Sequence, residues 1–226
     1  MPYPEETDRR SGLTKIAEMG ISAIPGVGGP LQIAFAEAAG RRLAERRTQW
    51  LHSVTEEING LSDRLGSVEQ LVYNDTFMDA LTTASQIADR TSQAEKIALL
   101  RNAVVNSTLP GAPDDDTQQL FFTMIDRFTP THMRLLILLS DPAGWFSRHN
   151  LARPNVAEGH KSVIVEAGIP TLAARPDLID RYAAALIDTG LVNSGGMMGA
   201  AGLWTPATTP LAAEFLDFIV TPQTRV

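Results

Sequence analysis

Few residues in this chain have the types and spacing needed for catalysis. Its four histidines form neither the HExxH pattern of a zinc protease nor another metal-ligand spacing. Ser147-Arg148-His149 does not make a catalytic triad by itself, and GxSxG, P-loop and GxGxxG motifs are absent. Gly26-Val27-Gly28-Gly29 lacks the preceding strand and the lysine of a phosphate-binding loop. The sequence therefore predicts a protein with no catalytic residues, cofactor, metal ion or small-molecule substrate. The four histidines are His52, His132, His149 and His160.

Three consecutive acidic residues, Asp114, Asp115 and Asp116, are the remaining candidates for a metal site. Successive side chains at a helix start point in different directions, and no Asp-x-Asp-x-Asp-Gly loop follows them. Acidic residues in a first helical turn favour the helix dipole and can cap the helix. We interpret these residues as the start of a helix.

An apolar segment near the N-terminus, residues 19–40, has the clearest functional potential. It is broken by Pro25-Gly26-Val27-Gly28-Gly29-Pro30, and Gln32 and Glu37 interrupt it further. It therefore lacks the run of about 20 apolar residues that a membrane-spanning helix needs. The segment fits three roles: a buried helical hairpin, a partner surface, or a segment that enters a membrane or drives self-assembly. The residues assigned to the last role are Ile21, Ile24, Gly26, Gly28, Gly29, Leu31, Ile33 and Phe35.

Four arginines, Arg41, Arg42, Arg46 and Arg47, follow this segment directly. Such a group could contact anionic lipid headgroups at a membrane interface. At 100° per residue, however, the four spread over about two-thirds of the helix circumference. A solvated stretch with salt bridges is the alternative interpretation.

The elements that carry these residues are mostly helices. A helix is expected over residues 11–24, and a second from Pro30, well placed as a first helical residue, to about Leu65. The first third of the second helix is apolar on every side, which requires burial in protein or lipid. Its later part carries an apolar stripe about 100° wide. The stripe consists of Leu43, Trp50, Leu51, Val54, Ile58, Leu61 and Leu65.

Start signals mark several of the later helices. We expect caps at Asn74 or Asp75, a capping box from Ser92 to Glu95, and helix starts at Thr129-Pro130 and Thr209-Pro210. Residues 142–161 are expected to form a loop with a short helix, and residues 163–174 to be mostly helical. A helix is also expected over residues 176–189, and the glycine-rich stretch 194–202 is expected to be the tip of a β-hairpin.

Composition excludes some classes of function. The chain has 226 residues, no cysteine and a net charge of −7. It therefore contains no disulfide, and its acidity disfavours nucleic acid as a partner, because phosphate binding depends on clustered lysine and arginine. The absence of cysteine fits a reducing compartment. The opening residues, MPYPEETDRR, do not resemble a secretory signal.

The C-terminal third resembles a winged-helix module. The phrase LIDTGLV at residues 186–192 is similar to the end of the helix before a wing, and TTPLAAEFL at residues 208–216 to the start of the closing helix. Alanine replaces a frequent glycine in the second phrase. The helix over residues 176–189 carries three acidic side chains and one basic side chain, which disfavours a DNA-binding surface. These are Asp177, Asp180 and Asp188, and Arg181.

A wider resemblance covers about residues 90–220. The phrases SQAEKIALLRNAVVNST and FFTMIDRFTPTHMRLLILLSDP are similar to the central part of bacterial Abi-alpha-type proteins, which are associated by name with abortive phage infection. The shared residues belong to the core, so the resemblance implies a context of bacterial defence and supplies no active-site residues.

These observations together predict a mainly α fold: an N-terminal helical hairpin and bundle, then a winged-helix-like module with a small β-hairpin. We expect a disordered tail over residues 1–10, the bundle over 11–128 and the module over 129–226. The predicted function is that of a non-enzymatic defence effector whose apolar segment engages a membrane or drives self-assembly. The alternative is a soluble winged-helix module that binds protein or, with less support, DNA. The expected location is the cytoplasm, peripheral to the inner membrane if the segment binds lipid, and the expected partner is a second copy or another protein.

Overall fold

The computed structural model describes residues 30–61, 71–156, 158–199 and 202–221, with side chains from residue 37 onward. The chain divides into two compact units, Met1–Ser53 and Val54–Val226. The described residues are mainly helical, which confirms the predicted mainly α class. The expected tail over residues 1–10 and the expected helix over residues 11–24 lie outside the described residues.

Helix α2 spans Pro30–Asn59 and begins at the predicted proline. Its predicted end near Leu65 is wrong, since the helix stops at Asn59 and a turn at Gly60 and Leu61 follows. Glycine is a poor helix former, which favours an end to the helix at this point.

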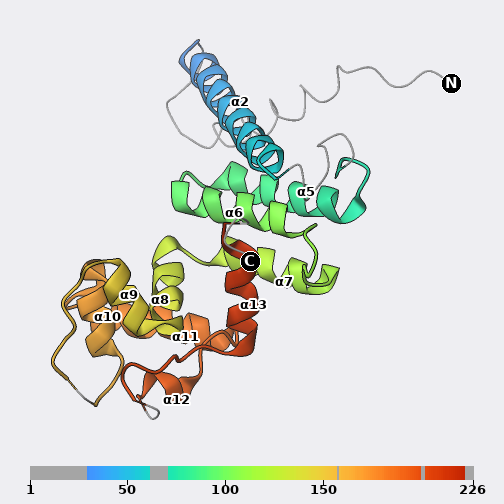
Figure 1. The fold of residues 1–226 in the computed structure, drawn as a ribbon. Coiled ribbons are helices and arrows are strands. Elements are labelled where there is room, and N and C mark those ends of the chain that lie inside the picture. The colour runs from blue at the N-terminus through green and yellow to red at the C-terminus, as the bar shows by residue number, and fades with distance from the viewer. Residues whose placement is uncertain (1–29, 62–70, 157, 200–201, 222–226) are drawn as a thin grey trace. The chain divides into compact units, whose positions relative to one another are not determined.

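Four helices pack together in the second unit. Helix α6 contacts α5, α7 and α13, and α5 also contacts α7 (Figure 1). The core between α7 and α13 is aromatic: the ring centroids of Phe121 and Phe215 lie 5.2 Å apart, and those of Phe122 and Phe218 lie 5.6 Å apart. Edge-to-face ring contacts of this kind favour one defined packing. The four helices are α5 (Asp75–Arg90), α6 (Ala94–Asn106), α7 (Asp115–Arg127) and α13 (Pro210–Ile219).

Side-chain caps start three of these helices where the sequence predicts them. The side chain of Asn74 accepts a hydrogen bond from the Phe77 N–H at 3.0 Å. Asp114 accepts one from the Thr117 N–H at 2.8 Å. Thr209 Oγ1 accepts one from the Ala212 N–H at 3.2 Å. Each cap satisfies a backbone donor that the first helical turn leaves without a partner.

The predicted capping box at Ser92 is wrong. The residue before α6 is Gln93, and its side chain caps no backbone N–H. The turn is instead stabilised from Thr91, whose hydroxyl accepts the Gln93 N–H at 3.2 Å. Glu95 is not free to complete the box because it forms an ion pair with Arg134 of a later helix.

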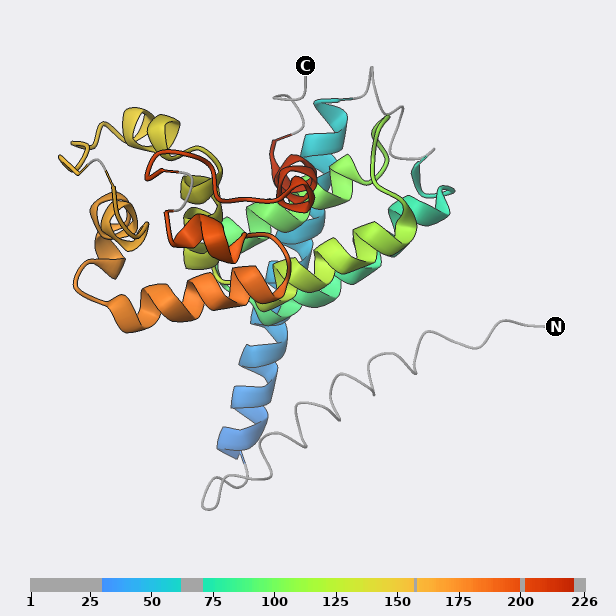
Figure 2. The same ribbon diagram turned by 90° about the horizontal axis from the view of Figure 1, so that it is seen from below.

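A second group of helices follows. Helices α8, α10 and α11 contact one another, α9 packs against α8 and α10, and α13 contacts both α6 and α8 (Figure 2). The helices expected from Thr129-Pro130 and over residues 176–189 are confirmed, as is the short helix expected within residues 142–161. The bounds are α8 (Pro130–Ser140), α9 (Pro142–Arg148), α10 (Ser162–Gly168), η1 (Pro170–Leu172) and α11 (Pro176–Asp188).

The expected β-hairpin does not form in the described residues. Val192 and Thr208 make one isolated antiparallel bridge, and the expected tip contains the short helix α12 (Ser194–Met197). Around the bridge, the Asn193 N–H donates to the Ala207 carbonyl at 2.8 Å and the Thr209 N–H to the Leu191 carbonyl at 3.0 Å. Pairing goes no further because the chain enters α12 at Ser194. The carbonyl groups of Gly202, Leu203 and Thr205 accept hydrogen bonds from the Lys161 side chain.

Candidate interaction surface

The apolar stripe of α2 is only partly buried. Trp50, Val54, Ile58 and Leu61 are buried, with exposed fractions of 6% or less. Leu43 and Leu51, in the same helical sector, are 50% and 41% exposed. Because large apolar side chains gain free energy on leaving water, an exposed continuation of a buried stripe marks a surface available for contact.

The helix around Leu43 is exposed on nearly all sides. Between residues 37 and 49, only Ala39 and Arg46 are even half-buried. Small side chains leave the backbone accessible here, and a Cβ added at Gly40 would meet no atom within 4 Å. We use "α2 surface" for the exposed part of the helix over residues 37–51.

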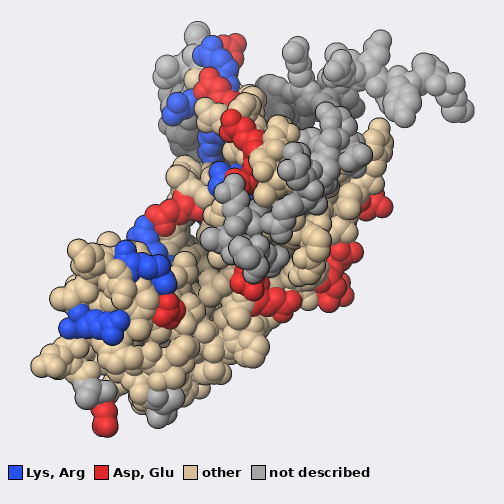
Figure 3. Space-filling view, in the orientation of Figure 1, with Lys and Arg blue, Asp and Glu red and all other residues tan. Residues whose placement is uncertain are grey.

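Charge on the α2 surface is mixed but basic on balance. The arginines predicted to follow the apolar segment lie here; Arg41, Arg42 and Arg47 are exposed and Arg46 is half-buried. Against these four arginines stand two glutamates, Glu37 and Glu45, which gives residues 37–51 a net charge of +2. Basic and acidic groups alternate along the helix (Figure 3), so the arginines do not form one uniform basic face.

The predicted membrane or assembly residues are only partly described. Leu31, Ile33 and Phe35 lie in the first turns of α2, where the backbone alone is described. Ile21, Ile24, Gly26, Gly28 and Gly29 lie outside the described residues. In the described part of the chain, every helix is too short or too polar to cross a bilayer.

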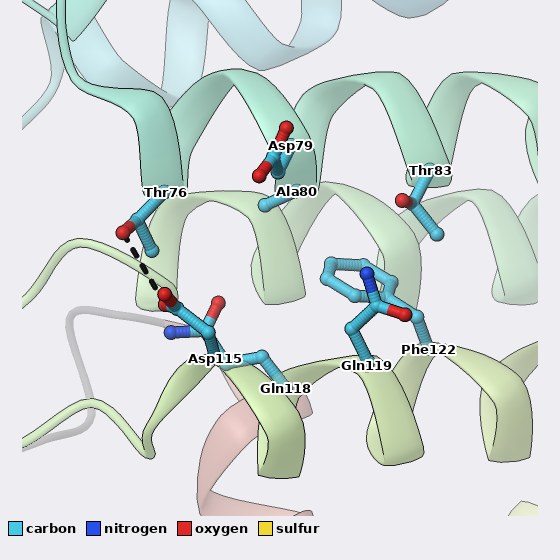
Figure 4. A pocket seen from close by; sticks show the side chains of 8 residues that line it. All are labelled: Thr76, Asp79, Ala80, Thr83, Asp115, Gln118, Gln119 and Phe122. Carbon is cyan, nitrogen blue, oxygen red and sulfur yellow. Dashed lines mark hydrogen bonds between the residues drawn. The ribbon is translucent and has the colours of Figure 1, made fainter.

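A shallow polar groove lies between α5 and α7 (Figure 4). Asp79 and Thr83 line it from α5, and Asp115 and Gln119 from α7. Thr76 Oγ1 donates a hydrogen bond to Asp115 Oδ1 at 3.3 Å, which links the two helices at one end. The cavity volume of about 40 Å³ admits little more than a water molecule, so the groove offers a docking surface and no substrate pocket.

The two helices that border this groove carry acidic and exposed apolar side chains. Residues 71–89 and 102–126 contain no lysine or arginine, and the acidic residues stand out over α5 and α7 in Figure 3. On the same two helices, Met78 of α5 and Leu120 of α7 are 37% and 45% exposed. Two exposed carboxylates, Asp79 and Asp115, line the groove. We use "acidic groove" for the groove together with the exposed acidic residues at the start of the two helices, Asp75, Asp114 and Asp116.

None of the carboxylates and histidines in the described part of the chain gathers into a group that could bind a metal ion. Asp114 instead caps α7, and the hydrogen bond from the Thr117 backbone lowers the pKa of its carboxyl group. Asp115 and Asp116 occupy the first turn of α7. The interpretation of residues 114–116 as a helix start is confirmed.

A larger pocket, of about 450 Å³, opens where α6 and α8 begin beside Tyr182 of α11. Its Arg134 pairs with Glu95, so their charges largely cancel. Nearby, His132 stacks on Phe128 and meets the edge of the Tyr182 ring at a centroid distance of 4.5 Å. Burial lowers the pKa of His132 to about 4, with Arg127 contributing. Its Nδ1 accepts the Thr129 N–H at 3.1 Å, so this imidazole caps α8.

The Ser147-Arg148-His149 phrase is used within its own helix. Ser147 Oγ donates to the Ala143 carbonyl at 3.1 Å, and Arg148 pairs with Asp141 at 2.8 Å. The His149 ring stacks on Trp145 with centroids 3.9 Å apart. None of these interactions joins the Ser147 hydroxyl to the His149 imidazole.

Lys161 is a buried residue that sequence reasoning missed. It is 1% exposed, and its ammonium donates to the carbonyls of Gly202, Leu203 and Thr205 at 3.1, 2.8 and 2.6 Å. Burial lowers the pKa of Lys161. Its backbone N–H also donates to the Met197 carbonyl at 3.1 Å, so Lys161 fastens the start of α10 to the segment after α11. A lysine between polar residues gives no sequence signal for this role.

Asn102 and Asn106 were also missed. Their side-chain amides donate to the Ile219 carbonyl at 3.0 Å and to the Phe218 carbonyl at 2.8 Å, at the C-terminus of α13. Terminal helix carbonyls lack intrahelical partners, so the two residues cap α13 from the side. Their i, i+4 spacing, which places both on one face of α6, was a usable signal.

Comparison of the chain with protein-family models finds no match. Neither the curated proteins nor the solved structures contain a match. The surfaces described above therefore have to be interpreted from their own chemistry.

Proposed function

We propose that this protein is a non-enzymatic effector that acts by self-assembly through the α2 surface. The bacterial defence setting comes from the Abi-alpha-type resemblance and forms part of the proposal. Assembly brings several copies of the apolar segment, residues 19–40, to one place. Peripheral membrane engagement is the further step that such clustering would promote.

One observation carries the proposal: within one apolar stripe, Trp50, Val54, Ile58 and Leu61 are buried, whereas Leu43 and Leu51 are 50% and 41% exposed. A stripe that ends at the edge of a protein core normally becomes polar, whereas this one remains apolar at Leu43 and Leu51.

The test places charges on the two sides of α2. Leu43→Asp together with Leu51→Asp should remove self-association because each carboxylate would have to be buried at the contact. Ala38→Asp together with Thr48→Asp adds the same charge to the same helix, outside the stripe, and should assemble like the parent chain. Sedimentation velocity over a range of concentrations measures the association.

Flotation with vesicles containing anionic lipid separates assembly from membrane binding. The proposal is supported if the parent chain self-associates in solution and the variant with Leu43→Asp and Leu51→Asp does not. Association that appears only on vesicles would favour direct membrane engagement. Equal behaviour of both double variants would contradict a role for the stripe.

A second candidate function rests on the mutual packing of α8, α10 and α11, a three-helix arrangement that a winged-helix module also has. On this proposal the module binds a protein partner. Asp177, Asp180 and Asp188 on α11 are exposed, and Arg175 is already paired with Asp177 at 2.9 Å. Such a face repels phosphate, so binding to duplex DNA that weakens steeply with salt would contradict the protein-binding version.

A further inference from the structure

We propose that the α2 surface of one copy docks on the acidic groove of the next copy. The contact joins two unlike surfaces, which lie on different elements of the chain. This inference rests on the proposed self-assembly and names the partner of the α2 surface. Two different patches can meet reciprocally in a closed dimer, or one after another in rings or filaments.

Charge complementarity carries the argument. The acidic groove presents five carboxylates, with no lysine or arginine in residues 71–89 or 102–126. The α2 surface has a net charge of +2 within a chain whose net charge is −7. Opposite potentials steer two copies together and set the orientation of the contact.

Apolar side chains are exposed on the helices of both surfaces. Leu43 and Leu51 on α2 are 50% and 41% exposed, and Met78 of α5 and Leu120 of α7 are 37% and 45% exposed. A protein interface combines a desolvated apolar centre with polar groups around it. Burial of these four side chains would supply affinity, and the charges around them would supply orientation.

The dimensions of the two surfaces agree. Residues 37–51 of α2 span about 22 Å, at a rise of about 1.5 Å per residue. Helices α5 and α7, with 16 and 13 residues, span about 24 and 20 Å. The exposed part of α2 is therefore about as long as the two helices that border the groove, and it would lie on their surface along the groove.

Pairing of two α2 surfaces with each other is less favourable. Each carries four arginines against two glutamates, so most of the charges that meet would repel. The acidic groove offers these arginines carboxylate partners. Among them, Asp79 is exposed on α5 and makes no ion pair among the described residues.

The experiment exchanges charges between the two surfaces. The helix variant carries Arg42→Glu and Arg47→Glu. The groove variant carries Asp79→Lys and Gln119→Lys, at exposed positions beyond the first turns of α5 and α7, where the helix dipole is little affected. A control with Arg127→Glu and Arg181→Glu makes the same charge change as the helix variant on exposed residues outside both surfaces.

Each variant alone should sediment at lower mass than the parent chain because like charges meet at its contact. An equimolar mixture should recover the parent mass, since glutamates of one variant then face lysines of the other and the unchanged surfaces also pair. Recovery shows in addition that both variants are folded. The control should assemble like the parent chain, and 0.5 M NaCl should weaken assembly of the parent chain.

Three results would overturn the inference. A groove variant that assembles alone like the parent chain would show that α2 has another partner, and the proposed self-assembly would stand. Loss of assembly in both variants without recovery on mixing would exclude the contact between these two surfaces. A parent chain that never assembles would overturn both proposals.

Discussion

At the scale of single residues, buried polar groups hold the second unit in its arrangement. The Lys161 ammonium donates hydrogen bonds to three backbone carbonyls. The side-chain amides of Asn102 and Asn106 donate hydrogen bonds to backbone carbonyls at the end of α13. A buried acceptor that loses its donor pays the full cost of desolvation. These side chains therefore fix how loops and helix ends are placed, beyond what apolar packing determines.

Lys161→Met tests the role of the buried lysine. The variant keeps the length of the side chain but leaves the carbonyls of Gly202, Leu203 and Thr205 without their donor. We expect the free energy of unfolding to fall by about 2–3 kcal/mol in urea denaturation. Glu158→Met, at an exposed position nearby, is the control and should change it by less than about 0.5 kcal/mol. A similar small change in the Lys161 variant would refute the role.

His132 gives the protein a defined dependence on pH. Its pKa is lowered from 6.5 to about 4, so between these values the unfolded chain binds the proton and the folded chain does not. The contribution of the neutral His132 side chain to the free energy of unfolding is fully present above pH 6.5 and is lost as the pH falls toward 4.

His132→Gln removes this titration, and glutamine at the same position can still accept the Thr129 N–H. Between pH 7 and pH 4.5, the parent chain should lose about 1 kcal/mol more than the variant, after allowance for the half-exposed ring. Chemical denaturation at both pH values measures the difference. Equal losses of the free energy of unfolding in the parent chain and the variant would show that His132 is protonated in the folded state as readily as in the unfolded state.

At the scale of elements, local start signals were the most predictable features. Asn74, Asp114 and Thr209 cap helices as predicted because a cap needs only the residue and the next turn. The capping box predicted from Ser92 to Glu95 did not form, and Glu95 instead pairs with Arg134, a residue distant in sequence. The predicted hairpin did not form because the chain enters α12 directly after one bridge, and Lys161, distant in sequence, holds the returning segment. Long-range bonds of this kind leave no periodic pattern.

Two glycine substitutions test the contrast between the exposed α2 and the packed helices. Gly40→Ala should stabilise α2 by about 0.5–1 kcal/mol, because alanine restricts the unfolded chain and its Cβ meets no atom within 4 Å. Gly168→Ala should destabilise α10, since its Cβ would lie 2.5 Å from Leu138 Cδ1. Amide hydrogen exchange in each helix measures both effects. Faster exchange in α2 of the Gly40 variant would indicate a contact that requires glycine.

At the scale of the whole molecule, the candidate site was predictable only in part. The periodicity around Leu43 and the run of arginines after residue 40 indicated α2 as the element of interest. The acidic groove was not predicted, because Asp79 and Asp115 come from helices separated in sequence and only packing brings them to one groove. Charge summed over segments, with no base in residues 102–126, was the signal that could have suggested it.

In the proposed assembly, the distribution of charge determines how copies meet. A net charge of −7 keeps copies apart in general, while the basic α2 surface provides one place where an acidic partner is attracted. Self-association through that surface is the central claim.

The most direct test of this claim is the weight-average mass of the unmodified full-length protein, measured by sedimentation equilibrium from low to high micromolar concentration. The account predicts a mass that rises with concentration well beyond the 24.5 kDa of one chain and falls again at high salt. A mass that stays at 24.5 kDa at every concentration and salt level would contradict it.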